Sequence, residues 1–157
     1  MGMDVYGRKP KSEVGEYFRR NVWGWRPLWE YCCNIHIDII GEKLAEYGHY
    51  NAGYGLSVHK SVKLAKALKE DVRSGTAEQY IQARDEHIKS LPDEPCKYCD
   101  ENGNRTWLEN ELEVVKVCNA CQGKKSQPHF ATWYRLDLDD IKEFAEFLEN
   151  CGGFNIY

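Results

Sequence analysis

Two Cys-x-x-Cys pairs constrain this chain more than any other feature of its sequence. Cys96 and Cys99 form the first pair, Cys118 and Cys121 form the second, and together they spell C-x2-C-x18-C-x2-C. This spacing lies in the range that is typical of zinc sites. A Cys-x-x-Cys turn directs two thiolates toward one point, and two such turns complete a tetrahedron of sulfurs. The sequence therefore predicts one Zn²⁺ per chain, held by these four cysteines.

Four protein thiolates would close the coordination sphere of the metal. A closed site has no open position for water or substrate, so the predicted role of the zinc is structural rather than catalytic. Two alternatives remain at this point, a redox-active pair of dithiols and four thiols without a metal. His129 is a further candidate ligand, although it also suits an ordinary polar turn.

The overall composition favours a small globular protein. The chain has 157 residues, 42% of them hydrophobic, and a formal net charge of −4. This charge argues against non-specific binding of duplex DNA, which depends on neutralising phosphates. No run of about 20 apolar residues predicts a membrane span, and the first residues do not resemble a signal peptide. We therefore expect a cytoplasmic protein, where cysteine pairs hold metal more often than they form disulfides.

The pattern of apolar residues predicts an α+β fold. We expect a small helical domain (residues 1–92), a zinc-knuckle β-hairpin insert (93–130) and a C-terminal strand–helix–strand (131–157) that completes the helical domain. The individual segments expected are a strand over 2–7, a loop over 8–22, helices beginning near Trp25, after Ser57 and at Thr76, a hairpin over 106–117, a strand over 131–136, a helix after Asp137 and a strand over 154–157.

Each cysteine pair resembles half of the zinc centre of the DnaJ chaperone family, whose repeat reads C-x-x-C-x-G-x-G. The first pair keeps Gly103 but has Glu101 in place of the other glycine, and the second keeps Gly123 but has Lys125 in place of the other. The chain has no His-Pro-Asp motif of a J domain. The resemblance implies a DnaJ-like zinc knuckle and no chaperone activity.

A broader resemblance extends over the whole chain. The segments MGMDVYG, GEYFRRNVWGWRPLW, NAGYGLS, the two cysteine knuckles and EFAEFLENCGGF follow one another from end to end. The chain thereby resembles a set of short bacterial and phage proteins that share this order of landmarks. The resemblance implies one compact zinc-containing unit, and it implies no activity.

Residues 8–26 combine basic and aromatic side chains. They hold six positive and two negative residues, a local charge of +4, and Arg19, Trp23, Trp25 and Arg26 are among them. Aromatic rings stack on bases and guanidinium groups bind phosphate, so this composition suits a nucleotide or single-stranded nucleic acid. Alternatively, the aromatic rings belong to the core while the arginine head groups reach the solvent.

The glycine-rich loop HYNAGYGLS (49–57) precedes a predicted helix. A helix N-terminus after such a loop can hold an anion, and Asn51, Tyr54 and Ser57 would supply polar contacts. The loop lacks the lysine and the spacing of a phosphate-binding P-loop.

Together these features favour a binding protein without catalytic activity. The predicted partner is a nucleic acid or nucleotide. One alternative is a protein-interaction module, for example a phage-type inhibitor of a host system. A second alternative is a small enzyme in which Cys32 or Cys33 acts as the nucleophile and His36 as its base.

Overall fold

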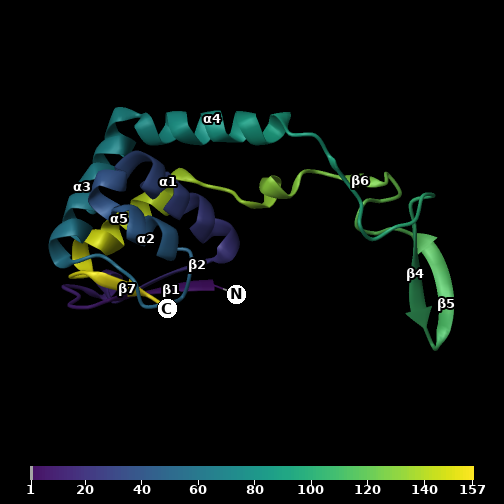
Figure 1. The fold of residues 1–157 in the computed structure, drawn as a ribbon, viewed down its shortest axis with the longest axis horizontal. Coiled ribbons are helices and arrows are strands. Elements are labelled where there is room, and N and C mark those ends of the chain that lie inside the picture. The colour runs from purple at the N-terminus through teal and green to yellow at the C-terminus, as the bar shows by residue number, and fades with distance from the viewer. Residues whose placement is uncertain (1) are drawn as a thin grey trace. The chain divides into compact units, whose positions relative to one another are not determined.

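The computed structural model describes residues 2–157, so Met1 of the MGMDVYG landmark lies outside the described residues. The fold is α+β, as predicted, with five α-helices and small antiparallel sheets in the described part of the chain. The chain forms two compact units. The first comprises the residues up to Asp85 together with Trp133–Tyr157, and the second comprises Glu86–Thr132 (Figure 1).

A three-stranded antiparallel sheet lies at one side of the first unit. Its strands are β1 (Gly2–Gly7), β2 (Tyr17–Asn21) and β7 (Phe154–Ile156), in the order β2-β1-β7. Side chains alternate between the two faces of a strand. The buried face carries Met3, Val5, Phe18, Phe154 and Ile156. The sheet therefore contributes one apolar face to the core and leaves its other face uncovered by helices (Figure 1).

Helices supply the rest of the core of the first unit. They are α1 (Val22–Ile40), α2 (Glu42–Tyr47), α3 (Val58–Ser74) and α5 (Leu138–Asn150), with the first part of α4 (Thr76–Ser90). Trp25 and Trp29 of α1 are fully buried and stack on each other at 5.4 Å between ring centroids. Phe144 of α5 meets the edge of Trp25 at 5.7 Å. Aromatic packing between α1 and α5 thus forms the centre of this core.

The helix boundaries follow local sequence signals. Asn21 caps α1 by accepting a hydrogen bond from the Gly24 amide at 2.9 Å. Gly41, with φ of 84°, separates α1 from α2. Asp137 and Asp140 form a capping box at the start of α5. Helices predicted after Ser57, at Thr76 and after Asp137 are confirmed. Among the described residues, no helix is long and apolar enough to cross a membrane.

The second unit contains two short antiparallel ladders. Strands β4 (Asn104–Glu109) and β5 (Leu112–Val117) form the predicted hairpin, while β3 (Glu94–Pro95) pairs with β6 (Ser126–Gln127). The turn of the hairpin is made by Asn110 and Glu111, both with positive φ. Such a two-residue turn matches the twist of the flanking strands.

Two predicted segments are wrong. Residues 8–22 are not a loop, because they contain the 3₁₀ helix Glu13–Gly15 and strand β2, which pairs with β1. The segment 131–136, the first strand of the predicted C-terminal strand–helix–strand, contains the end of the 3₁₀ helix Phe130–Trp133 instead. There the Thr132 amide donates to the His129 carbonyl at 2.9 Å, which closes a local turn.

The boundaries of the units differ slightly from the predicted ones. The insert was expected over 93–130, but the second unit begins at Glu86, within α4, and ends at Thr132. The first unit resumes at Trp133, whereas the return to the first domain was expected at residue 131.

Gly55 tests how tightly the loop before α3 packs on β7. A Cβ at this position would lie 1.7 Å from the carbonyl oxygen of Phe154. We expect Gly55→Ala to lower the free energy of unfolding by at least about 2 kcal/mol, because the backbone of the loop or of β7 must move to accommodate the added Cβ. Gly24→Ala is the matched control, since its Cβ would meet no atom closer than 3.6 Å. Equal unfolding midpoints for both variants in urea would contradict this packing.

Candidate metal centre

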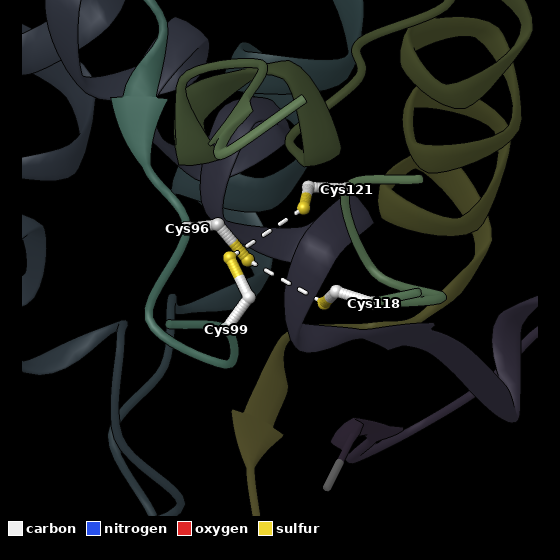
Figure 2. Close-up of side chains that lie close together, drawn as sticks. All are labelled: Cys96, Cys99, Cys118 and Cys121. Atoms are coloured by element: carbon white, nitrogen blue, oxygen red, sulfur yellow. Dashed lines mark hydrogen bonds between the residues drawn. The ribbon is translucent and has the colours of Figure 1, made fainter. Parts of the chain in front are cut away.

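The four cysteines of the two pairs lie together in the second unit. Their sulfurs lie within 4.8 Å of one another, and Cys96 Sγ is 3.9 Å from Cys118 Sγ while Cys99 Sγ is 3.7 Å from Cys121 Sγ (Figure 2). A tetrahedral Zn²⁺ with Zn–S bonds of about 2.3 Å places its sulfurs about 3.8 Å apart. A disulfide would bring two sulfurs to about 2.05 Å. The sulfur positions therefore fit a metal ion.

Backbone pairing brings the two knuckles together. The first pair follows β3 and the second follows β5. The ladder between β3 and β6 places Pro95 opposite Ser126. It continues in a hydrogen bond from the Cys96 amide to the Lys125 carbonyl at 2.8 Å. Residues that are distant in sequence thus become neighbours, and each knuckle directs its sulfurs inward (Figure 2).

Two glycines allow the knuckles to approach each other closely. Gly103 and Gly123 both have φ of 79°. A Cβ at Gly103 would lie 2.5 Å from the Gly123 carbonyl oxygen. The Gly103 carbonyl accepts a hydrogen bond from the Cys118 amide at 2.9 Å. These are the two glycines that the sequence retains from the DnaJ-type repeat, and they lie at the contact between the knuckles.

The surroundings of Cys96 stabilise its thiolate form. Burial raises the pKa of Cys96, but hydrogen bonds from the Tyr98 backbone amide and the Gln127 side chain outweigh it and lower the pKa to about 6. Gln127 Nε2 lies 3.0 Å from the sulfur. Burial, followed by the neighbouring cysteines Cys96 and Cys121, raises the pKa of Cys99. One thiolate therefore forms readily, and a bound cation would favour the others.

His129 is not part of the sulfur cluster. Its Nε2 lies 3.3 Å from Glu94 Oε1, and its Nδ1 accepts a hydrogen bond from the Ala131 amide at 3.1 Å. Both ring nitrogens therefore have protein partners. His129 is therefore a polar turn residue, which is the alternative that the sequence also allowed.

The second unit has almost no apolar core. Within Glu86–Thr132, all of which the structure describes, the buried hydrophobic residues are Cys118 and Cys121. Large apolar side chains such as Leu108 and Val115 are exposed. A unit of this size without a core usually depends on metal or disulfides for its stability. All seven cysteines of the chain are free, which leaves the four-thiol cluster as the element that can hold this unit together.

The predicted basic-aromatic residues do not form one surface. Trp25 is fully buried, and its Nε1 donates to the Gly48 carbonyl at 2.8 Å. The prediction that Trp25 contacts a ligand is therefore wrong. Because α1 begins at Val22, Trp25 lies on the buried side of this helix. Trp23 and Arg26 both contact Tyr134. The rings of Trp23 and Tyr134 are 4.7 Å apart between centroids, and Arg26 Nη1 donates to the Tyr134 hydroxyl at 3.2 Å.

Arg19 lies apart from these aromatic residues. It belongs to β2, is exposed, and has its Nε 3.4 Å from Asp4 Oδ1. Its side chain points to the face of the sheet that faces away from the core, because Arg19 is in register with Asp4 and alternates with the buried Phe18.

The glycine-rich loop is used for structure. The Gly53 amide donates to the Ile156 carbonyl at 2.8 Å, and the Tyr54 carbonyl accepts from the Ile156 amide at 2.8 Å. Asn51 donates to the Gly2 carbonyl at 3.2 Å, and Ser57 caps α3. The glycines are explained by this pairing with β7. Asn51, Tyr54 and Ser57 thus each have a hydrogen-bond partner within the protein.

Burial raises the thiol pKa of both cysteines of α1. Cys32 is fully buried, and burial, followed by the neighbouring Cys33 and Asp71, raises the pKa of its thiol. Burial and the nearby Glu30 raise the pKa of Cys33 to about 12. His36 instead contacts Asp71, with 2.7 Å between Nε2 and Oδ2. Burial therefore favours the protonated thiol at both positions, whereas a nucleophile needs the thiolate.

Sequence reasoning missed two groups of residues that bear on function. Gln127 was not recognised as a partner of Cys96, and no local pattern marks it. Tyr6 and Tyr157 were not recognised as surface residues beside Arg19. The alternation in GMDVYG is the signal that could have placed Tyr6 opposite the buried Val5.

Comparisons with protein-family models, curated proteins and solved structures found no match to this chain. The resemblances to the DnaJ zinc centre and to short phage and bacterial proteins therefore stay predictions.

Gly103 provides a test of the contact between the knuckles. We expect Gly103→Ala to weaken metal affinity by at least about tenfold, because the added Cβ would collide with backbone of the other knuckle. Gly123→Ala has the same positive φ, but its nearest contact is a Val117 methyl group at 3.3 Å. It is the matched control for backbone strain. Competition with a chromogenic chelator measures the metal affinity of both variants. Equal losses of affinity would contradict the close contact between Gly103 and the second knuckle.

Proposed function

We propose that this chain is a zinc-containing binding protein without catalytic activity. One Zn²⁺ per chain is held by Cys96, Cys99, Cys118 and Cys121, and its role is structural. A basic and aromatic surface of the protein contacts nucleic acid or nucleotide. The observation that supports the zinc most strongly is the cluster of four sulfurs within 4.8 Å of one another, in a fully described unit whose only buried hydrophobic residues are two of these cysteines.

The donor set supports zinc over magnesium and calcium. Four thiolates suit zinc or an iron–sulfur centre, whereas magnesium and calcium prefer oxygen ligands. Zinc is redox-inactive and takes four sulfurs in a tetrahedron. Four protein ligands leave no position for water, so the ion would stabilise the fold of residues 86–132 and take no part in a reaction.

The metal content of the purified protein tests this proposal. We expect a native mass spectrum, recorded without chelator, to show one zinc per chain. Cys99→Ser and Cys121→Ser should each lose most of the metal, because a thiolate ligand is removed. Cys33→Ser is the matched control, since Cys33 lies outside the cluster, and it should retain one zinc. A wild-type protein without metal, with a mass lowered by disulfides, would instead support the redox alternative.

Removal of the zinc should unfold one unit selectively. Because the metal replaces an apolar core in residues 86–132, a strong chelator should increase amide hydrogen exchange there. The buried core of the first unit should retain its protection, since it does not include the ligands.

A second candidate function is supported by the hairpin. Four apolar side chains of β4 and β5 are between 63% and 77% exposed: Leu108, Leu112, Val115 and Val117. Three glutamates, Glu109, Glu111 and Glu113, lie among them. Arg105 and Lys116 are on the same hairpin, and Lys116 pairs with Glu109, so the surrounding charge is mixed but mainly acidic. Exposed apolar side chains in such surroundings favour a protein partner that has an apolar centre and basic residues at its rim.

Variants of the hairpin test this second candidate. If it is correct, a partner should copurify with the protein after nuclease treatment, and Leu108→Glu with Val115→Glu should abolish the complex without loss of zinc. Val58→Glu in α3 is the matched control, because Val58 is also an exposed aliphatic residue. Retention of the complex by the hairpin variant would exclude this surface.

A further inference from the structure

The uncovered face of the β2-β1-β7 sheet has an unusual composition. The antiparallel register places six side chains there, away from the core: Asp4, Tyr6, Tyr17, Arg19, Asn155 and Tyr157. We call this set the open face. None of the six is aliphatic. By contrast, neighbouring positions on the same strands, such as Val5 and Ile156, are fully buried.

Three tyrosine rings form the centre of the open face. Tyr6 lies 5.0 Å from Tyr17 and 6.1 Å from Tyr157 between ring centroids. The rings are between 43% and 52% exposed. Solvent therefore reaches aromatic surface from β1, from β2 and from Tyr157, which directly follows β7.

Hydrogen bonds hold two of these rings in position. The Tyr17 hydroxyl donates to Asp4. Asn155 Nδ2 donates to the Tyr157 hydroxyl at 3.0 Å, and Asn155 Oδ1 accepts from Arg8 Nε at 2.7 Å. Side chains that are already ordered lose little conformational entropy when a ligand binds.

Positive charge lies beside the tyrosines. Arg8 and Arg19 are both exposed, and the acidic residue on the open face is Asp4, 3.4 Å from Arg19. A guanidinium group that is paired with one surface carboxylate has further N–H donors and can still bind a phosphate in a bidentate manner. The carboxylate of Asp4 can accept a hydrogen bond from a base amino group.

We propose that the open face binds single-stranded nucleic acid, with bases stacked on Tyr6, Tyr17 and Tyr157 and phosphates contacting Arg8 and Arg19. This inference rests on the binding role proposed above and assigns it to a surface, but it does not depend on the zinc centre. Aromatic rings on an open sheet recognise unpaired bases because every base has a π-face.

The composition favours nucleic acid over a protein partner. A protein-docking face needs an apolar centre that can be fully desolvated, and aliphatic residues are absent from the described open face. Rings with polar edges, flanked by guanidinium groups, instead match flat bases linked by phosphates. The net charge of −4 argues against a general polyanion binder, whereas a local site for a short single strand needs only nearby arginines.

Fluorescence anisotropy with a labelled single strand tests the proposal. The probe is oligo(U) or oligo(dT) of about 12 nucleotides, used with the zinc-loaded protein at low and at moderate salt. We expect Tyr6→Leu and Tyr17→Leu each to weaken binding about tenfold, because leucine keeps apolar bulk on a strand but cannot stack. Arg19→Gln should lower the slope of log affinity against log salt by about one.

Tyr50→Leu is the matched control. Tyr50 is 60% exposed but lies in the loop before α3, outside the open face. It should leave the affinity unchanged. Thermal unfolding and zinc content of every variant confirm that the fold is intact.

The outcomes separate this inference from the proposed function. If the wild-type protein binds the oligonucleotide and the tyrosine variants bind equally well, the open face is wrong and nucleic acid is bound elsewhere. The wild-type protein could instead carry zinc but bind neither oligonucleotide at low salt. That result would contradict both the open-face proposal and the nucleic-acid role, and it would leave the proposed structural zinc unaffected. Competition by a neutral oligosaccharide would also overturn the assignment.

Discussion

The approach of four sulfurs to within 4.8 Å of one another is the constraint on which the proposed structural role of the metal depends. Residues 86–132 form two short ladders and several turns, with buried hydrophobic side chains limited, in this described segment, to Cys118 and Cys121. Such a unit gains little from the hydrophobic effect, which normally offsets the conformational entropy lost on folding. The energy of metal–thiolate bonds can replace that missing contribution. The hairpin and its exposed apolar side chains would then be displayed on a stable support.

The first unit is stabilised by a different principle. Its core is aromatic, with Trp25, Trp29 and Phe144 in direct contact and fully buried. This explains why a stretch rich in tryptophan and arginine does not form a single surface. The stretch contributes to β2 and to α1, so Trp25 turns inward while Arg19 faces solvent. The uncovered side of the sheet carries Tyr6, Tyr17 and Arg19 from its strands, with Arg8 and Tyr157 next to them, and it is the surface that we propose for recognition.

The cluster of four cysteines could be predicted from the sequence because its signal is local. The spacing of Cys96, Cys99, Cys118 and Cys121 specifies two tight turns, and helix caps such as Asp137 act within one turn of the chain. Strand β2 was missed because its pairing with β1 is non-local and its sequence is mostly polar. The open face was missed for the same reason, since it combines Tyr6 and Tyr17 with Tyr157 from the other end of the chain. Local patterns do not report such register.

The sulfur coordination of the bound metal tests the central claim most directly. X-ray absorption at the zinc edge of the purified protein measures the type, number and distance of the ligands. The account predicts four sulfurs at about 2.3 Å and no nitrogen or oxygen ligand. A nitrogen or oxygen at about 2.0 Å would contradict a closed set of four thiolates and would restore His129 or water as a ligand.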